Sequence, residues 1–241
     1  MDSSSDAPGS RRCPGGWARF GRPQEGVDIT GAFGSVLRVS GELDTATAAY
    51  AARLERLEMA WWKRLLDVQR PYRWHLRSLG LGPTLDVGCG RGRNLINLGS
   101  RDGDVGVDHN VESVAAARSR GLKAFVPDEF RMSPYAQRGH FDALLLSHVI
   151  EHMQPAEARG LMTEYLPCIR GGGRVVLMTP QPAGYRSDPT HVSFTDLDAL
   201  AALATDLGLK VTKRYSFPFP QFVGSIFKHN EFVLVAETPQ R

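Results

Sequence analysis

The chain has 241 residues, of which 42% are hydrophobic and 23% are charged. This apolar content supports a folded core and excludes a chain that is disordered throughout. The length suits one larger domain, or a domain with an additional arm. Lys and Arg number 29 against 26 for Asp and Glu, a net charge of +3. That balance argues against a polyanionic partner such as a nucleic acid.

The sequence shows no sign of membrane insertion or export. It contains no run of about 18 apolar residues, so no membrane-spanning helix is predicted. Its N-terminus lacks a positively charged segment followed by an apolar one, which predicts no secretion signal. We therefore expect a cytoplasmic protein, and the sequence does not indicate an oligomeric state.

The first 82 residues differ in character from the rest. Residues 1–40 are rich in Ser, Gly, Pro and Arg without a sustained period, which predicts a disordered or loosely packed tail. A helical pattern follows over 44–66, Pro71 interrupts it, and a second short helix is expected to end near Leu79. Residues 41–82 are therefore predicted to form a helical arm or lid.

Short apolar runs alternate with amphipathic segments over residues 83–241, the predicted main domain. Strands are expected at 84–87, 104–107, 122–126, 141–146, 174–178, 210–215 and 232–237, and helices at 91–98, 111–120, 155–169 and 195–207. Thr195 is the expected N-cap of the last helix. The alternation predicts an α/β fold, a Rossmann-like three-layer sandwich around a seven-stranded, mostly parallel sheet. The last two strands have no helix between them, so the last strand is expected to be antiparallel.

A glycine-rich turn follows the first predicted strand. Gly88, Gly90 and Gly92 allow the backbone to approach a ligand closely and to offer amides to it. Asp108 lies 20 residues after Gly88, at the end of the second strand. An acid there can accept hydrogen bonds from both ribose hydroxyls of an adenosine cofactor.

The charges around this turn distinguish between adenosine cofactors. Arg93 stands where the dinucleotide fingerprint has a glycine. Asp86 lies two residues before the first glycine, where a carboxylate suits a cationic ligand better than a pyrophosphate. Electrostatics therefore favour S-adenosylmethionine. An NAD-linked Rossmann oxidoreductase and a non-catalytic S-adenosylmethionine-binding scaffold remain alternatives.

Four segments carry a family resemblance in order and spacing. They are LDVGCGRG at 85–92, GVD at 106–108, FDALLLSHVIEH at 141–152 and GGRVVL at 172–177. With them the chain from about 84 to 237 resembles a class I S-adenosylmethionine-dependent methyltransferase of the small-molecule type. The resemblance implies S-adenosylmethionine as the cofactor and a seven-stranded sheet with an antiparallel last strand. It does not cover the first 80 residues.

The resemblance also implies a set of cofactor contacts at the strand ends. Asp86 and Gly88 would lie near the amino-acid part of the cofactor, and Asp108 would hold the ribose. Asp128 or Glu129, after the third strand, would lie near the adenine amine. The remaining expected contacts are Cys89, Gly90, Asn94, His109, Ser147 and His148.

The fourth strand leads into H-x-x-E-H, a spacing also found in zinc peptidases. The motif follows a buried strand directly and Pro155 comes close behind, so we expect neither a peptidase helix nor a metal site. In a methyltransferase, Ser147 and His148 would lie beside the transferred methyl group. His148 is then a candidate catalytic base or substrate-positioning residue, or a structural contact to the cofactor. Glu151 and His152 are expected to cap or pack the helix start.

The loop over residues 179–194 is expected to border the acceptor pocket. Tyr185, Arg186 and His191 are its candidate substrate contacts, and His191 is a second candidate base. The alternative is that His191 packs under the loop. Phe219 is a further candidate substrate contact in an aromatic stretch that either packs or forms a ring-stacking wall.

These features predict methyl transfer to an oxygen, or a nitrogen, of a small-molecule, sugar or lipid-linked acceptor. The reaction needs alignment, exclusion of water and, for a hydroxyl acceptor, a base. No module or basic cluster indicates a nucleic-acid partner.

Overall fold

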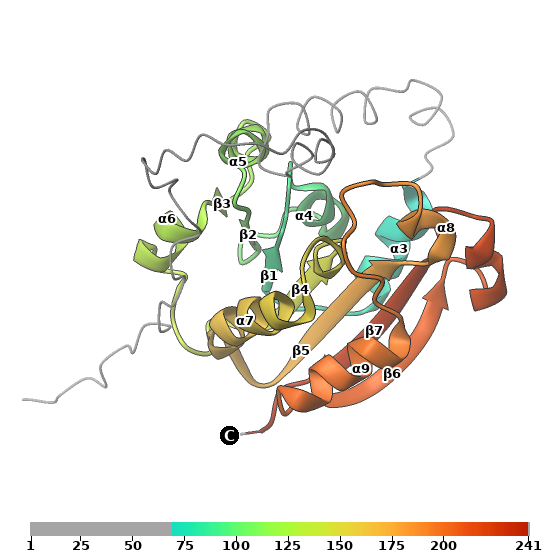
Figure 1. Cartoon of the computed structure of the whole chain (residues 1–241). Coiled ribbons are helices and arrows are strands. Elements are labelled where there is room, and N and C mark those ends of the chain that lie inside the picture. Colours follow the sequence, from blue (N-terminus) through green and yellow to red (C-terminus); the bar gives the residue numbers. More distant parts are fainter. Residues whose placement is uncertain (1–68, 241) are drawn as a thin grey trace, which may run out of the picture.

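The structure is a computed structural model that describes residues 69–240 (Figure 1). The expected tail over 1–40 and the expected helix over 44–66 lie outside the described residues. The described strands are β1 (Thr84–Val87), β2 (Val105–Val107), β3 (Ala124–Phe125), β4 (Phe141–Ser147), β5 (Ile169–Pro180), β6 (Lys210–Phe217) and β7 (Glu231–Glu237). The described helices are α3 (Arg70–Ser78), α4 (Arg93–Leu98), α5 (Val111–Arg118), α6 (Pro127–Met132), α7 (Pro155–Tyr165), α8 (Pro182–Tyr185) and α9 (Leu197–Asp206), with 3-10 turns η1 (Ile150–His152), η2 (Leu166–Cys168) and η3 (Gln221–Ser225).

The seven strands form one sheet in the order β3-β2-β1-β4-β5-β7-β6. The pairs from β3 to β5 are parallel, and β7 is antiparallel to both β5 and β6. In the register of β5 with β7, Leu177 lies opposite Leu234. The predicted fold class, including the antiparallel last strand, is confirmed.

Alternating side chains of the central strands supply two apolar faces. Leu144 and Leu146 of β4 belong to a cluster with residues of α7 and α9. Ala143 and Leu145 belong to a second cluster, with Leu76 of α3 and Leu98 of α4. In Figure 1, α7 and α9 cross in front of the strands. Since both faces are covered, β4 is buried along nearly its whole length, as expected for a central parallel strand.

The helix α3 begins at Arg70, one residue before the proline that was expected to interrupt a helix. Pro71 occupies its first turn, where the missing amide has no partner to lose. Leu76 is 3% exposed and packs against the sheet, so this end of the expected arm is part of the core. The division of the chain into a tail, an arm over 41–82 and a domain from 83 stays a prediction.

The N-cap expected at Thr195 is wrong by one residue. Asp196 caps α9, because its side chain accepts hydrogen bonds from the amides of Asp198 at 3.1 Å and Ala199 at 2.9 Å. The hydroxyl of Thr195 instead donates to the carbonyl of Ser193 at 3.4 Å. Both residue types cap helices well, so only the backbone geometry separates them.

Prolines explain two further differences between the predicted and the observed helices. The helix expected over 155–169 ends at Tyr165, because Pro167 cannot donate the next hydrogen bond and Ile169 already starts β5. After β3, Pro127 starts α6, a helix that the sequence reading placed nowhere. Its position in the first turn is the favourable one for proline.

Candidate active site

A cavity of about 570 Å³ lies at the carboxyl ends of the central strands. From β1 the chain adds strands toward one edge of the sheet, and from β4 it adds them toward the other edge. Open α/β sheets bind ligands at such a switch point in strand order. The lining comes from the glycine turn after β1, the ends of β4 and β5, the loop after β5, α3, and the segment before β7. Its volume is in the range of small-molecule and cofactor sites.

The two glycines of this turn differ in their surroundings, since position 88 is closely packed and position 90 is open. Gly88 has φ +77°, and a Cβ there would lie 2.2 Å from Cγ2 of Val149. Gly90 has φ +52°, yet a Cβ there would meet nothing within 4 Å. Both residues line the cavity. The turn therefore needs glycine at 88 for packing, whereas glycine at 90 keeps space free for a ligand.

Asp108 ties this turn to the end of β2. Its Oδ2 accepts a hydrogen bond from the Gly90 amide at 2.7 Å, and its Oδ1 accepts one from the Asn110 amide at 2.8 Å. Each oxygen retains a lone pair that a ribose hydroxyl could use. The neighbouring His109 is largely exposed, with its Nδ1 3.7 Å from Oδ1 of Asp108. The ribose contact stays a prediction that this geometry permits.

Asp86 is a buried carboxylate without a hydrogen-bond partner for either oxygen among the described residues. Burial raises its pKa to about 7, against the opposing effects of Asn94 and Arg93. An unpaired buried carboxylate is costly unless a donor or a cation compensates it. A cationic cofactor such as S-adenosylmethionine fits this site, whereas a pyrophosphate would add negative charge to it.

Three further expected cofactor contacts line the cavity. Asn94 and Ser147 are each 7% exposed, and Cys89 is 5% exposed. The Cys89 side chain packs so closely to β2 that a Cβ on Gly106 would lie 2.6 Å from its Sγ. Burial, together with the nearby acids, raises the pKa of Cys89 well above its ordinary value. Cys89 therefore acts as a packing residue and not as a reactive thiolate.

The two acids expected near the adenine form ion pairs at the surface. Asp128 pairs with Arg131 and Glu129 pairs with Arg118, and both carboxylates face solvent. Neither residue is among those that line the described cavity. The reason is α6, whose first turn holds both acids at its positive end. The adenine contact of Asp128 or Glu129 stays a prediction.

His148 lies between two carboxylates. Its Nδ1 is 3.2 Å from Oε1 of Glu151, and its Nε2 is 2.8 Å from Oε1 of Glu231. Burial opposes the charged form, but these two carboxylates outweigh it and raise the pKa of His148 to about 10. An imidazolium that donates from both nitrogens cannot accept a proton. The geometry therefore argues against His148 as a base and favours the positioning alternative.

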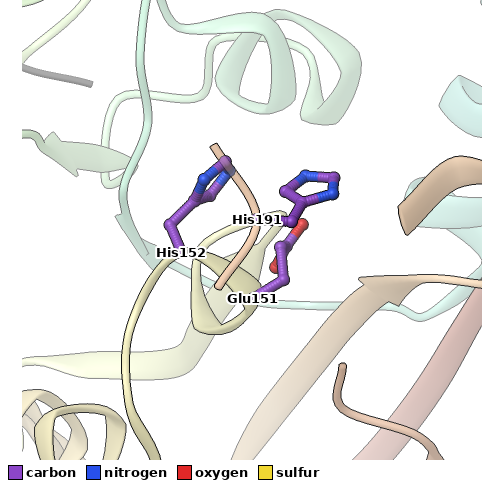
Figure 2. A group of neighbouring side chains, drawn as sticks. All are labelled: Glu151, His152 and His191. Atoms are coloured by element: carbon purple, nitrogen blue, oxygen red, sulfur yellow. The ribbon is translucent and has the colours of Figure 1, made fainter. Parts of the chain in front are cut away.

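The H-x-x-E-H segment does not form a peptidase helix. Residues 150–152 form the 3-10 turn η1, and His148 lies before it with φ +59°. The partner of His152 is His191 from the loop after β5, with ring centroids 4.8 Å apart. Figure 2 shows these two rings gathered with the carboxylate of Glu151. The spacing of the motif pairs His148 with His152, whereas in the structure His152 contacts His191.

The two rings share one hydrogen-bonding pattern. Nδ1 of His152 lies 3.2 Å from the carbonyl oxygen of Thr190, and Nδ1 of His191 lies 2.8 Å from that of Tyr185. Because a carbonyl only accepts, each Nδ1 carries a proton, and the neutral form of each ring would have its lone pair on Nε2. Burial lowers the pKa of His152, which favours its neutral form. His191 lines the cavity and stays the candidate base.

A backbone anchor holds this loop against η1. The carbonyl oxygen of Glu151 accepts hydrogen bonds from the amides of Val192 at 2.8 Å and Ser193 at 3.1 Å. Asp188 stabilises the preceding turn by accepting from the Thr190 amide at 3.1 Å. These contacts fix the position of the loop relative to Glu151.

The other expected substrate contacts lie outside the described cavity lining. Tyr185 stacks on His191 at 5.3 Å, so it supports that ring. Arg186 is exposed and donates from Nη2 to the carbonyl oxygen of Ser225 at 3.1 Å. Phe219 is 47% exposed and contacts the edge of Phe227, which does line the cavity.

Some residues that line the cavity come from segments distant in sequence and were not predicted. Tyr72 of α3 lines the cavity, and its hydroxyl donates to the carbonyl oxygen of His229 at 2.7 Å. Glu231 lines it because β7 pairs with β5, opposite Pro180. These residues lie in no motif, so only the folded topology identifies them.

Comparisons with known proteins agree on the family. A family model described as a methyltransferase domain matches residues 50–214, more than half of the chain. No curated protein matches the chain at a significant level.

Many solved structures share the fold at low sequence identity. A SAM-dependent methyltransferase from Archaeoglobus fulgidus has 17% identity and a TM-score of 0.51, covering 73% of this chain and 99% of its own. A TehB-like SAM-dependent methyltransferase from Corynebacterium glutamicum has 16% identity and a TM-score of 0.54, covering 80% and 100%. An N-methyltransferase, NodS, from Bradyrhizobium japonicum has 15% identity and a TM-score of 0.54, covering 71% and 97%. With the family match, the sheet order and the unpaired Asp86, the chain belongs to the methyltransferase domain family as a class I S-adenosylmethionine-dependent methyltransferase.

Proposed function

We propose that this methyltransferase acts on an oxygen of a small-molecule acceptor, such as a sugar or a lipid-linked metabolite. The observation that carries this proposal is the cavity, which extends from the glycine turn to His191. Its volume suits a cofactor with a small acceptor and not a macromolecular surface. A nitrogen acceptor is the second candidate, since a neutral amine needs no base.

Each side chain of this site has a separate role in the proposed reaction. Bound S-adenosylmethionine supplies a methyl group on a positively charged sulfur. Asp86 compensates the cofactor's positive charge, and Asp108 orients the ribose. His191 holds a lone pair on Nε2 that can take the proton of an acceptor hydroxyl, while Tyr185 fixes the ring through its carbonyl oxygen. The contribution of such a base is typically about 10²–10⁴-fold in rate.

The charge of the chain gives little support to a nucleic-acid partner. The net charge of +3 offers no strong field for nucleic acid. Over residues 69–240, the helices are too short or too polar to cross a bilayer.

The proposed function is tested by binding and by product analysis. We expect calorimetry to show tight binding of S-adenosylhomocysteine and no binding of NADH. With methyl-labelled S-adenosylmethionine, we expect the label to enter a small molecule of a cell extract whose mass rises by one CH₂ unit. Label found only in protein or nucleic acid would contradict the acceptor class, and a methylated amine would favour nitrogen.

Gly90→Ala should weaken cofactor binding without disturbing the fold. The added methyl group meets no protein atom within 4 Å and enters the cavity at the glycine turn. We expect S-adenosylhomocysteine affinity to fall at least about tenfold, while the left-handed backbone costs about 1 kcal/mol of stability. Calorimetry and thermal unfolding measure the two effects.

Gly121→Ala is the matched control, because Gly121 also has a positive φ, of +77°, with nothing within 4 Å of a Cβ. It does not line the described cavity. A similar loss of cofactor affinity in both variants would show that backbone strain, and not occupied space, is responsible.

A further inference from the structure

The cluster of Glu151, His152 and His191 has a geometry that its hydrogen bonds do not explain. One potential ligand atom from each residue lies within 4.8 Å of the others. Figure 2 shows the three side chains converging from η1 and from the loop after β5. His152 and His191 line the cavity, so the cluster borders the acceptor space.

Each residue in this cluster keeps one electron pair unused. Oε1 of Glu151 contacts His148, but Oε2 is buried and has no hydrogen-bond partner. The carboxylate is 0% exposed, so water does not reach that oxygen from the surface. The two histidines direct Nδ1 to backbone carbonyls, which leaves Nε2 of each as the available nitrogen. Metal-bound histidines are typically fixed in this way, by a hydrogen bond from the other ring nitrogen.

From this arrangement we propose that Glu151, His152 and His191 bind one divalent transition-metal ion, such as Zn²⁺. Two histidines and one glutamate form a known zinc ligand set that leaves positions open for water or substrate. Imidazole ligands favour zinc, iron, nickel or copper over magnesium and calcium. Ligand atoms in a tetrahedral zinc site lie about 3.4 Å apart at bonds of about 2.1 Å, so side-chain shifts of about 1 Å complete the site.

The ion also defines a role in the reaction, which rests on the proposed oxygen acceptor. A hydroxyl bound at the open position loses its proton to solvent more easily, because the cation stabilises the oxyanion. The oxygen then forms a bond to the methyl carbon, while the carbon–sulfur bond breaks and its electron pair stays on sulfur. The products are the methyl ether, S-adenosylhomocysteine and one proton. In the metal-bound protein, His191 is a ligand and the metal replaces it as the activating group.

Metal binding can be measured without an acceptor. Untagged full-length protein is freed of metal with a chelator and titrated with Zn²⁺ by calorimetry and with Co²⁺ by visible absorption. We expect one ion per chain and a Co²⁺ spectrum typical of nitrogen and oxygen ligands. His152→Ala and His191→Ala should each lower Zn²⁺ affinity by at least about 100-fold, the upper end of what loss of a supporting residue costs.

His229→Ala is the control, since it removes a cavity histidine outside the cluster. S-adenosylhomocysteine affinity reports whether each variant is folded, and if one ligand variant does not fold, the other decides. The proposal is wrong if no Zn²⁺ binds, or if both ligand variants bind it as tightly as the wild type. Zn²⁺ binding at these residues together with a methylated amine or macromolecule would retain the metal site and reject the proposed acceptor.

Discussion

Asp86→Asn should stabilise the cofactor-free protein at pH 8 and weaken S-adenosylmethionine binding. The pKa of Asp86 is raised to about 7, so its carboxylate lowers the folding stability once it ionises in the native state. This cost is absent below pH 4 and grows as the pH rises to 7. At full ionisation the shift corresponds to about 4 kcal/mol, which the neutral asparagine avoids.

Two measurements check this expectation. Denaturant unfolding at pH 4, 6 and 8 should show a difference between variant and wild type that grows with pH. Calorimetry on the wild type should show cofactor affinity falling about tenfold for each pH unit below 7, because the protonated acid no longer compensates the cation.

Asp104→Asn is the control, and its stability at pH 8 is expected to change in the opposite direction. Asp104 is also buried, but it accepts from the Thr84 amide at 3.0 Å and pairs with Arg101 at 2.9 Å. We expect this variant to lose stability at pH 8, since it leaves Arg101 without its charge partner. A stabilised Asp104→Asn, or an Asp86→Asn variant that loses stability at pH 8, would contradict the assigned role of Asp86.

Glu231→Gln should lower the pKa of His148 and destabilise the protein at pH 7. His148 has its pKa raised to about 10, so its ion pairs contribute fully below pH 6.5 and lose their contribution as the pH rises toward 10. Removal of Glu231 leaves a largely buried imidazolium with one carboxylate partner. We expect a loss of about 3 kcal/mol at pH 7, the lower end for a broken buried pair, because the His148 side chain is 30% exposed.

The pKa of His148 is measured from the pH dependence of its NMR signal, and the stability of the variant from its free energy of unfolding. The stability difference between Glu231→Gln and wild type should shrink between pH 7 and pH 10. Glu237→Gln, at the other end of β7, is the control and should leave the His148 titration unchanged. A His148 pKa near 6.5 in the wild type that does not change in Glu231→Gln would return His148 to the candidate bases.

The parts of the fold that the sequence predicts are those set by local pattern. Asp86, the glycine turn and Asp108 lie within 23 residues of one another, and their spacing reflects one strand–turn–helix–strand unit. The continuous apolar run of β4 similarly fits its position in the middle of the sheet, where both faces of the strand are buried. These features need no knowledge of distant contacts.

The parts that the sequence does not predict depend on long-range pairing. The protonation state of His148 depends on Glu231, 83 residues away, and the antiparallel placement of β7 brings the two together. His191 meets His152 only because amides of the loop bind the carbonyl of Glu151. The N-cap of α9 differs by one residue because Thr195 and Asp196 are both good capping residues.

The glycine turn and the loop after β5 have a consequence for how this enzyme could diversify. The cavity wall at the glycine turn comes from residues between 88 and 97, whereas further lining comes from the loop that ends at the Glu151 anchor and from the segment before β7. We expect a chimera that exchanges residues 181–190, and so retains His191, to alter acceptor choice while S-adenosylhomocysteine affinity stays constant. Such a result would show that substrate preference and cofactor use are separable traits, open to independent selection.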